Sequence, residues 1–241
     1  MQRFFLLKTA RLSLYLLEES EVDSRSSLVY NTIIINRLNM KRRSLVHRFR
    51  GLMPVVIDCE TGGVNAKTDA LLELAAVIVD YRDNKLVPVE TFHYHVQPFV
   101  GANLDPQALE VTQIKPDHPF RFAQPEHEVL VDLHKKLKKW MHDLNCRRAV
   151  MVAQNAQFDF DFIQAALGRC SLQDDSPWHR FTTFDTATVG AVWLGEPVLA
   201  RAVRKAGIDF DVNQAHSALY DAERTADFFC QIINQVDQRA R

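Results

Sequence analysis

Hydrophobic residues recur with two different periods from residue 54 onward, and each period predicts a different kind of element. Three consecutive runs have the length and composition of strands. They are PVVIDCE (54–60), LLELAAVIVDY (71–81) and TFHYHVQPF (91–99), the last with period-two alternation. We therefore predict three successive strands in the first half of this region.

Helical spacing dominates the rest of the chain. It predicts helices over PEHEVLVDLHKKLKKWMHDL (125–144), from about Phe158 to Leu167 and from about Ala218 to Val236, with a strand at AVMVA (149–153). Because consecutive strands are followed by strand and helix in alternation, we predict a mixed sheet with helices packed on it. The fold class is α/β, in a single domain.

Two carboxylates interrupt the end of the first hydrophobic run. Asp58 and Glu60 lie two positions apart in VVIDCETGG, so on a strand their side chains point to the same face. Two neighbouring carboxylates repel each other, and a divalent cation between them would relieve the repulsion. Oxygen ligands favour Mg²⁺ or Mn²⁺ over zinc. A solvated strand end with two surface acids is the alternative.

The last predicted helix offers a third acid. Asp221 lies on the flank of its apolar stripe, and His216 precedes the helix on a loop. A histidine beside a metal-binding carboxylate is suited to act as a general base, although an isolated histidine before a helix is often a cap or a packed side chain. Near AVMVAQNAQFDFDF, either Asp159 or Asp161 could supply a fourth carboxylate. Spacing alone does not choose between them.

Composition narrows the class of protein. The 241 residues are 47% hydrophobic, enough to form the core of one or at most two domains. The formal net charge is −1, so affinity for a polyanion has to come from local clusters of Lys and Arg. The four cysteines form no C-x-x-C pair, which argues against a zinc site or a disulfide framework and fits a reducing cytosol. We expect a cytoplasmic protein.

The first residues differ in character from the rest. Lys8 and Arg11 keep the apolar stretch MQRFFLLKTARLSLYLLEES short of a membrane span, so we expect no membrane association. A Ser/Asn-rich stretch and the basic run KRRSLVHRFR follow. We expect residues 1–46 to be a poorly ordered extension or an upstream error in the gene start, and residues 47–241 to be the functional domain.

Three motifs together resemble a known family. D-x-E-T begins at Asp58, N-A-x-F-D ends at Asp159, and H-x-A-x-x-D runs from His216 to Asp221. In this order they resemble the DEDDh family of 3′→5′ exonucleases. Further stretches resemble the bacterial branch that trims RNA 3′ ends, over roughly residues 47 to 236: RFRG, ETGG, NAKTDALLE, PFVGANL, TFDTA and QAHSALYD.

The resemblance implies a site and a fold. It implies a ribonuclease H-like mixed sheet of five strands and leaves Asp161 as a surface residue. The implied ligands of two Mg²⁺ ions, for which Mn²⁺ substitutes, are Asp58, Glu60, Asp159 and Asp221, with His216 as the general base. Two such cations can stabilise both the attacking and the leaving oxygen of a phosphodiester, releasing nucleoside 5′-monophosphates.

Binding residues are predicted from charge, rings and the resemblance. Phe158 and Phe181 match positions that stack on terminal bases, with core packing as the alternative. Basic residues cluster before the first strand and around the middle helix: Arg48, Arg50, Lys135, Lys136, Lys138, Lys139, Arg147 and Arg148. In the family such segments feed RNA into the partner's active site, which implies a homodimer. A merely solvated basic helix face is the alternative.

The chain also departs from the family pattern. Val64 and Val111 stand where phenylalanines are usual, and Gln107 stands where a glutamate that touches the terminal base is expected. Gln154 replaces a histidine before Asn155, a position that we expect to support the ligands from behind. We expect catalysis to survive these changes and the preference for the terminal base to differ.

Three functions compete on this evidence. The first is a 3′→5′ exoribonuclease that trims single-stranded 3′ ends of structured RNAs, such as tRNA precursors. The second is a DNA-directed proofreading or repair exonuclease with the same catalytic set. The third is a nucleic-acid-binding scaffold without activity, against which the intact acids and His216 argue. Contacts to a 2′-hydroxyl, which would separate RNA from DNA, are not legible in a sequence.

Overall fold

The computed structural model describes residues 43–239, so residues 1–42 of the predicted extension lie outside the described part of the chain. The compact unit begins at Arg43 rather than at residue 47. Leu45, in the short helix α3 (Leu45–Arg48), is only 1% exposed and belongs to the core. The residues just before the predicted boundary are therefore part of the fold.

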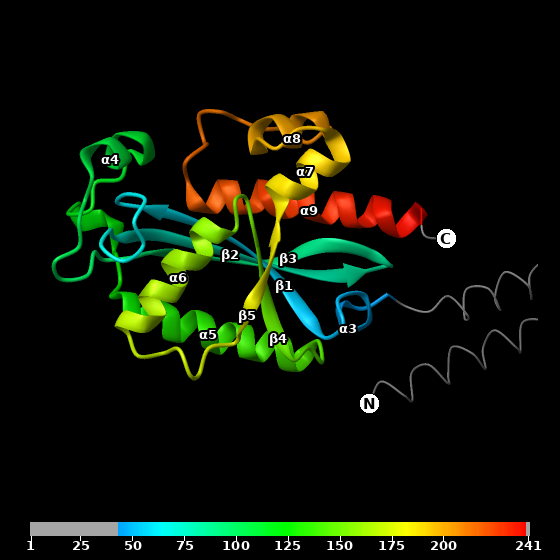
Figure 1. Cartoon of the computed structure of the whole chain (residues 1–241), viewed down its shortest axis with the longest axis horizontal. Helices are drawn as coiled ribbons and strands as arrows, with labels where there is room; N and C mark the ends of the chain where they lie inside the picture. The colour runs from blue at the N-terminus through cyan, green and yellow to red at the C-terminus, as the bar shows by residue number, and fades with distance from the viewer. Residues whose placement is uncertain (1–42, 240–241) are drawn as a thin grey trace, which may run out of the picture. The chain divides into compact units, whose positions relative to one another are not determined.

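A five-stranded mixed sheet forms the centre of the molecule (Figure 1), in the order β3-β2-β1-β4-β5. The strands are β1 (Leu52–Thr61), β2 (Leu71–Arg82), β3 (Lys85–His95), β4 (Arg148–Ala153) and β5 (Trp178–Asp185). The β1–β2 and β2–β3 pairs are antiparallel, whereas β1–β4 and β4–β5 are parallel. The mixed sheet predicted from the sequence is confirmed.

The third strand differs from its predicted bounds for a local reason. Asp83 and Asn84 both have positive φ, 51° and 62°, so a two-residue turn joins Arg82 to Lys85. The strand consequently begins at Lys85 and ends at His95, earlier at both ends than the alternating run suggested. β5 was not visible in the hydrophobic pattern, because its exposed and half-buried residues follow no clear period.

Helices cover both faces of the sheet. α9 (Ala218–Arg239) packs on β1, β2 and β3, and Figure 1 shows it on the side of the sheet opposite to α5 (Glu126–Asp143). The other helices are α4 (Pro106–Thr112), a 3₁₀ turn (Pro119–Arg121), α6 (Gln157–Arg169), α7 (Thr186–Leu194) and α8 (Leu199–Lys205). The three helices predicted from periodicity are present within a few residues of their expected bounds.

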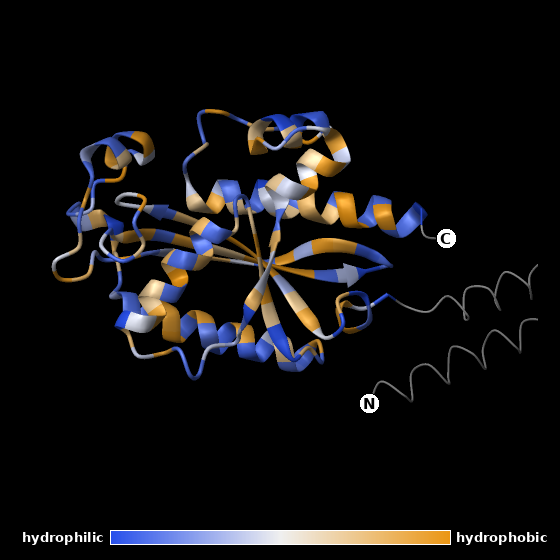
Figure 2. Ribbon diagram, in the orientation of Figure 1, coloured by the Kyte–Doolittle hydropathy of each residue, from blue (hydrophilic) through white to orange (hydrophobic). Residues whose placement is uncertain are grey.

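The core follows the hydrophobic pattern of the strands. β2 is buried along almost its whole length, and Figure 2 shows hydrophobic residues concentrated on the strands and on the inner sides of the helices. Phe49, Phe184 and Phe229 pack together, with ring centroids 5.7 to 6.3 Å apart, and join the start of the domain to β5 and α9. Within residues 43–239 every helix is too short or too polar to span a bilayer.

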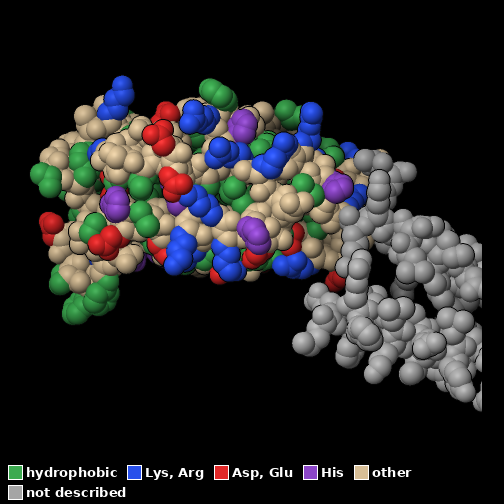
Figure 3. Space-filling view, turned by 90° about the horizontal axis from the view of Figure 1, so that it is seen from below, with side chains coloured by type: hydrophobic (Ala, Val, Ile, Leu, Met, Phe, Trp, Pro, Cys, Tyr) green, Lys and Arg blue, Asp and Glu red, His purple; other side chains and the backbone are tan. Residues whose placement is uncertain are grey.

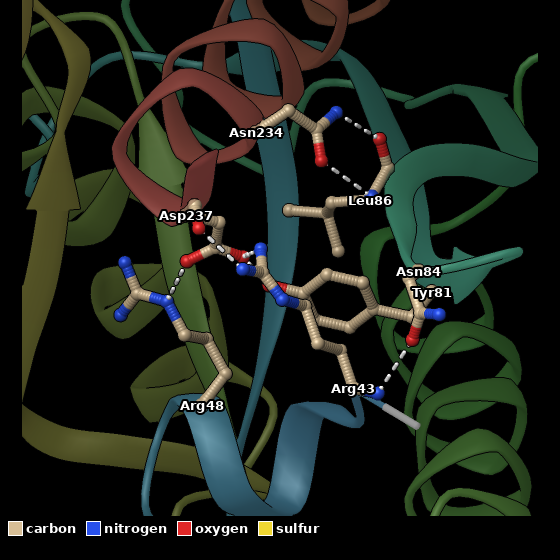
Figure 4. A network of polar contacts seen from close by, with 7 residues as sticks. All are labelled: Arg43, Arg48, Tyr81, Asn84, Leu86, Asn234 and Asp237. Carbon is tan, nitrogen blue, oxygen red and sulfur yellow. Dashed lines mark hydrogen bonds and ion pairs between the residues drawn. The ribbon is translucent and has the colours of Figure 1, made fainter. Parts of the chain in front are cut away.

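A polar network fastens α3 to the far end of α9 (Figure 4). Asp237 accepts hydrogen bonds from Arg48 Nε at 2.8 Å and from the Tyr81 hydroxyl at 2.6 Å, and Arg43 pairs with the same carboxylate. One turn earlier, the side-chain amide of Asn234 donates to and accepts from the backbone of β3, at 2.8 Å each. These contacts fix α9 along the sheet, and with it the acid at the beginning of the helix.

Candidate active site

The first two acids lie on one face of β1 near its carboxyl end. The register with β2 places Asp58 opposite Ala75 and Glu60 opposite Glu73, so both carboxylates point to the face that α9 covers. The chain leaves the strand through Gly62 and Gly63. A Cβ at Gly63 would lie 2.0 Å from a carboxylate oxygen of Asp69, so this tight turn has no room for a side chain.

Asp221 and His216 come from the start of α9. His216 has a left-handed backbone, φ 64°, and its N–H donates to Asp221 Oδ2 at 3.0 Å. Its side chain is exposed, whereas Asp221 is half-buried. Ligand atoms of Glu60, His216 and Asp221 all lie within 4.8 Å of one another. The fold therefore unites residues separated by more than 150 positions in the sequence.

Asp159 reaches the same place from α6. It lies in the first turn of that helix and is 3% exposed, whereas Asp161 is on the surface and accepts a hydrogen bond from Gln157 at 2.7 Å. Burial raises the pKa of Asp159 to about 7, against hydrogen bonds from the backbone amides of Asp159 and Cys59. Of the two candidate acids, only Asp159 faces the other carboxylates.

The pKa values of all four acids are raised, and burial is the largest cause for each of them. Burial, followed by repulsion from Asp159, Glu60 and Asp221, raises the pKa of Asp58 well above its usual range. Burial and then repulsion by Asp221, Glu73 and Asp159 raise the pKa of Glu60 to about 8. Burial also raises the pKa of Asp221, opposed by the backbone and charge of His216. Without a counter-charge, the site resists full ionisation.

The donor set fits divalent cations. Asp221 Oδ1 is buried and has no hydrogen-bond partner among the described residues, so one carboxylate oxygen is left facing the other acids. All four side chains offer oxygen, which hard divalent cations prefer. A bound cation would offset the repulsion that, after burial, raises the pKa values of Asp58 and Glu60. This is the chemistry expected of a metal-dependent phosphodiesterase site.

Asp185 positions the loop that leads to Asp159. It caps α7, accepting hydrogen bonds from the N–H groups of Ala187 and Thr188, both at 3.2 Å. The same carboxylate also accepts from the N–H of Asn155 at 2.9 Å. Asn155 has a left-handed φ of 57°, so Asp185 stabilises an unusual turn immediately before α6.

Comparison with known proteins places the chain in a family. A family model described as an exonuclease, RNase_T, matches residues 55–229. Ribonuclease T of Enterobacter sp. (strain 638) is 52% identical over 198 residues, covering 82% of this chain and 88% of that protein. Ribonuclease T of Escherichia coli (strain K12) is 51% identical over 198 residues, covering 82% and 92%. The chain belongs to the RNase T exonuclease family.

Solved structures agree on the fold. Escherichia coli exonuclease I in complex with a dT13 oligonucleotide matches with a TM-score of 0.59 and 16% identity, over 78% of this chain and 42% of that one. Another structure of exonuclease I gives a TM-score of 0.60 with the same coverage. The chain thus spans less than half of exonuclease I, and the similarity shows the fold alone. It confirms the expected ribonuclease H-like architecture.

The aromatic residues predicted to stack on bases have different surroundings. Phe158 is half-buried against Phe162, with ring centroids 5.0 Å apart, and lines a groove of about 600 Å³ together with Val64 and Lys67. Phe181 is 92% exposed on β5, so it is not part of the core. Two of the positions where this chain departs from the family, Val64 and Val111, are 85% and 56% exposed.

The two departures from glutamate and histidine also differ in setting. Gln107 is exposed in the first turn of α4, where its N–H bonds to the capping carboxylate of Asp105 at 2.9 Å. Gln154 donates to the carbonyl of Pro197 at 2.7 Å and accepts from the Thr186 hydroxyl at 2.8 Å. Gln154 therefore ties the end of β4 to the start of α7 and to the loop that follows this helix.

The predicted basic residues fall into two groups. Arg48 is bonded to Asp237 and lies over the ring of Phe49, so much of its charge is neutralised within the fold. Lys136 and Lys138 are half-buried and pair with Asp132 and Asp175. The other five are exposed on the surface: Arg50, Lys135, Lys139, Arg147 and Arg148. Figure 3, which views the molecule from below and so from the side of α5, shows lysines and arginines spread among acids and histidines. The basic surface is therefore mixed in charge.

Sequence reasoning missed one acidic residue beside the site. It is Glu73 of β2, whose carboxylate lies 3.0 Å from His95 Nδ1 and 3.5 Å from His93 Nε2. Only the pairing of β2 with β3 reveals this contact, since the residues are some twenty positions apart in the sequence.

Proposed function

We propose that this protein is a metal-dependent 3′→5′ exoribonuclease that trims the single-stranded 3′ ends of structured RNAs in tRNA and other stable RNA maturation. The convergence of Asp58, Glu60, Asp159 and Asp221 beside His216 carries this proposal. The 51–52% identity to proteins named Ribonuclease T supports RNA as the substrate.

Each residue has a distinct role in this proposal. The four carboxylates hold the cations, and the exposed imidazole of His216 accepts the proton of the attacking water. Because His216 lies on a loop while its backbone N–H is anchored to Asp221, the ring can move without leaving the site. When bound, two Mg²⁺ ions, or Mn²⁺ in their place, supply Lewis-acid stabilisation of the attacking and leaving oxygens. The product is a nucleoside 5′-monophosphate.

Metal binding has a thermal signature that is independent of catalysis. Because cations relieve carboxylate repulsion only in the folded state, excess Mg²⁺ or Mn²⁺ should raise the melting temperature by several degrees, roughly 2–4 °C per kcal/mol. Asp159→Asn should remove most of this shift. Asp161→Asn, which changes the neighbouring surface acid, should retain it, and an unchanged shift in Asp159→Asn would contradict the ligand assignment.

The basic residues point to a homodimer. Arg50 and Arg148 lie at the amino ends of the parallel strands β1 and β4, and the Arg147 guanidinium donates to the Arg50 carbonyl at 3.0 Å. The acids lie at the carboxyl ends, roughly 25 Å away along β1. Basic groups so distant serve the active site of a second copy more readily than their own, which supports RNA binding across a dimer.

The cysteines indicate the compartment in which the protein acts. All four cysteines are free thiols, as is usual in a reducing compartment, and we place the protein in the cytoplasm. In this proposal the substrate is the 3′ end of a structured RNA. Its bases stack on Phe158 and Phe181, and its phosphates contact the exposed basic residues.

A labelled hairpin provides the deciding experiment. A 5′-labelled RNA hairpin with a short 3′ overhang is incubated with the protein and Mg²⁺, and the products are resolved at single-nucleotide resolution. Stepwise shortening from the 3′ end that stops near the duplex is expected. Asp159→Asn should be inactive, and Asp161→Asn should retain activity.

Matched substrates distinguish the alternatives. A DNA hairpin of the same sequence should be shortened more slowly, and equal or faster cleavage of DNA would favour the proofreading or repair function. Internal cuts would exclude an exonuclease. Binding without cleavage would leave a scaffold role instead.

Subunit mixing tests the dimer. Asp159→Asn lacks an active site, and the triple variant Arg50→Gln/Lys139→Gln/Arg148→Gln lacks the proposed feeding residues. Random mixing of the two would give half heterodimers with one competent pair each, so about one quarter of wild-type activity should return. No recovery in the mixture would contradict feeding in trans, and sedimentation velocity reports separately whether a dimer forms.

A further inference from the structure

A row of polar side chains crosses three strands next to the proposed active site. Glu60 of β1 lies opposite Glu73 of β2, and Glu73 lies opposite His95 of β3. Residues directly opposite each other in a sheet point to the same face, so the row continues from the proposed catalytic acids to the edge strand. His93, two positions before His95 on β3, points to that face as well.

Glu73, His93 and His95 form a compact group. Glu73 Oε1 lies 3.0 Å from His95 Nδ1 and Oε2 lies 3.5 Å from His93 Nε2, and one ligand atom from each residue falls within a 4.8 Å cluster. The two imidazole centroids are 4.7 Å apart. Ligands around a tetrahedral zinc ion are separated by about 3.4 Å, given bonds of about 2.1 Å. The group is close to this spacing as it stands.

One buried atom in the group faces the carboxylate of Glu73. His95 Nδ1 is buried, and within the described chain its nearest polar neighbour is Glu73 Oε1 at 3.0 Å, with no other hydrogen-bond partner. The nearby Arg121 adds positive charge, but its Nη2 donates to the carbonyl of Leu72 at 2.6 Å. A buried nitrogen that faces a carboxylate is suited to share a cation with it.

The side chains are also accessible to an ion. The side chains of His93 and His95 are 26% and 35% exposed, and that of Glu73 is 12% exposed. Glu73 further borders a cavity of about 340 Å³, which His118 and His216 line as well. An ion and one or two waters can therefore reach the group from solvent.

We propose that Glu73, His93 and His95 form a second metal site, selective for Zn²⁺ or a similar borderline cation and separate from the proposed catalytic carboxylates. Two imidazoles and one carboxylate are zinc ligands, whereas Mg²⁺ avoids nitrogen donors. The site does not depend on the RNA proposal above.

The test measures zinc rather than activity. Protein is dialysed against Zn²⁺ in the presence of a large excess of Mg²⁺, which occupies the oxygen ligands, and retained zinc is counted per chain. Wild type should retain one Zn²⁺, and His93→Gln and His95→Gln should each weaken retention by at least about 100-fold, since even changes behind a ligand cost 10- to 100-fold. Co²⁺ in place of Zn²⁺ should give the visible absorption of a four-coordinate site in wild type and not in His93→Gln or His95→Gln.

Two controls keep the outcome specific. His127→Gln changes an exposed histidine on α5 and should retain the zinc. Asp159→Asn removes a proposed catalytic ligand and should also retain it. Zinc that is lost in Asp159→Asn, or kept in both His93→Gln and His95→Gln, would overturn the proposal. Circular dichroism and a metal-free melt establish that the variants are folded, so their loss of zinc is interpretable.

Discussion

Single carboxylates in this protein have properties that only their neighbours explain. Glu60 and Asp159 are both almost fully buried, and their pKa values rise to about 8 and about 7. Asp69, by contrast, has its pKa lowered despite burial, because Asn65, Thr68 and Asn103 donate hydrogen bonds to it. Asp69 is held in a turn by these hydrogen bonds, whereas Glu60 is surrounded by other acids and is proposed to bind a cation.

Replacing His216 tests the general base. His216→Ala should lower kcat about 10²- to 10⁴-fold, because the proton of the attacking water loses its acceptor. The melting shift with Mg²⁺ should persist, since in this assignment His216 is not a metal ligand. Single-turnover kinetics and a thermal melt measure the two effects separately. His142→Ala, an exposed histidine on α5, serves as the control, and loss of the Mg²⁺ shift in His216→Ala would make the residue a ligand instead.

The pH dependence of stability should reveal Glu60. Its pKa rises from 4.5 to about 8, so the metal-free fold favours the protonated carboxyl. That contribution is fully present below pH 4.5 and is lost as the pH rises through about 8. In EDTA, the free energy of unfolding of wild type should therefore fall by on the order of 2 kcal/mol relative to that of Glu60→Gln as the pH rises from mildly acidic to alkaline.

Urea unfolding across this range measures the difference. Because glutamine mimics the protonated acid at every pH, other titrating groups cancel in the comparison. If the free energies of unfolding of wild type and Glu60→Gln depend on pH in the same way, ionisation of Glu60 does not destabilise the fold and the prediction is wrong. Saturating Mg²⁺ should abolish the difference, because the cation replaces the proton.

At the scale of elements, two carboxylates outside the proposed site fix the positions of helices. Asp185 caps α7 and holds the turn before α6, so one carboxylate serves two helix starts. Near the carboxyl end of α9, Asp237 likewise joins several segments, because it bonds to Arg43, Arg48 and Tyr81. Asp185 thereby supports the turn that leads to Asp159, whereas Asp237 lies at the far end of α9 from Asp221 and stabilises the packing of that helix.

Asp237→Asn should destabilise the protein without a large effect on catalysis. Removing one partner of a largely buried ion pair leaves uncompensated charge, and we expect a loss of about 2–4 kcal/mol in the free energy of unfolding. Asp143→Asn breaks the exposed pair with Lys139 and should change stability by less than about 0.5 kcal/mol. Equal stabilities in urea would show that the Asp237 network contributes little.

At the scale of the whole molecule, the acids proposed as metal ligands and the exposed arginines lie at opposite ends of the parallel strands. β1 and β4 are parallel, so their carboxyl ends gather the acids while their amino ends carry Arg50 and Arg148. This separation follows from topology, and it is the physical basis for proposing that a second copy completes the RNA path.

The salt dependence of RNA binding tests that path. In Arg50→Gln/Lys139→Gln/Arg148→Gln, the slope of log K against log salt should fall by about 0.7 for each lost phosphate contact, or about 2 in total. Catalytically inactive protein and fluorescence anisotropy give the slope directly. The control variant Lys85→Gln/Arg201→Gln should keep the wild-type slope. The triple variant should still show the rise in melting temperature with Mg²⁺, because its metal ligands are unchanged. Arg48 is left unchanged because its loss would disturb Asp237.

Much of the fold and of the site was visible in the sequence. Periodicity gave three of the helices and four of the strands, because segments with one buried face must repeat their hydrophobic positions. The order of the acidic motifs indicated Asp58, Glu60, Asp221 and His216, and the resemblance selected Asp159. The fifth strand escaped, because β5 is largely half-exposed and follows no clear period.

The sequence by itself determined which residues are candidates for chemistry, because residue type and local spacing are properties of the chain. Only the tertiary structure decided which of them meet. Strand register places Glu73 beside His93 and His95. Burial distinguishes Asp159 from Asp161. A hydrogen bond to Asp237 on α9 gives Arg48 a structural role. Such encounters depend on pairing and packing across long stretches of chain, which local patterns of hydrophobicity do not specify.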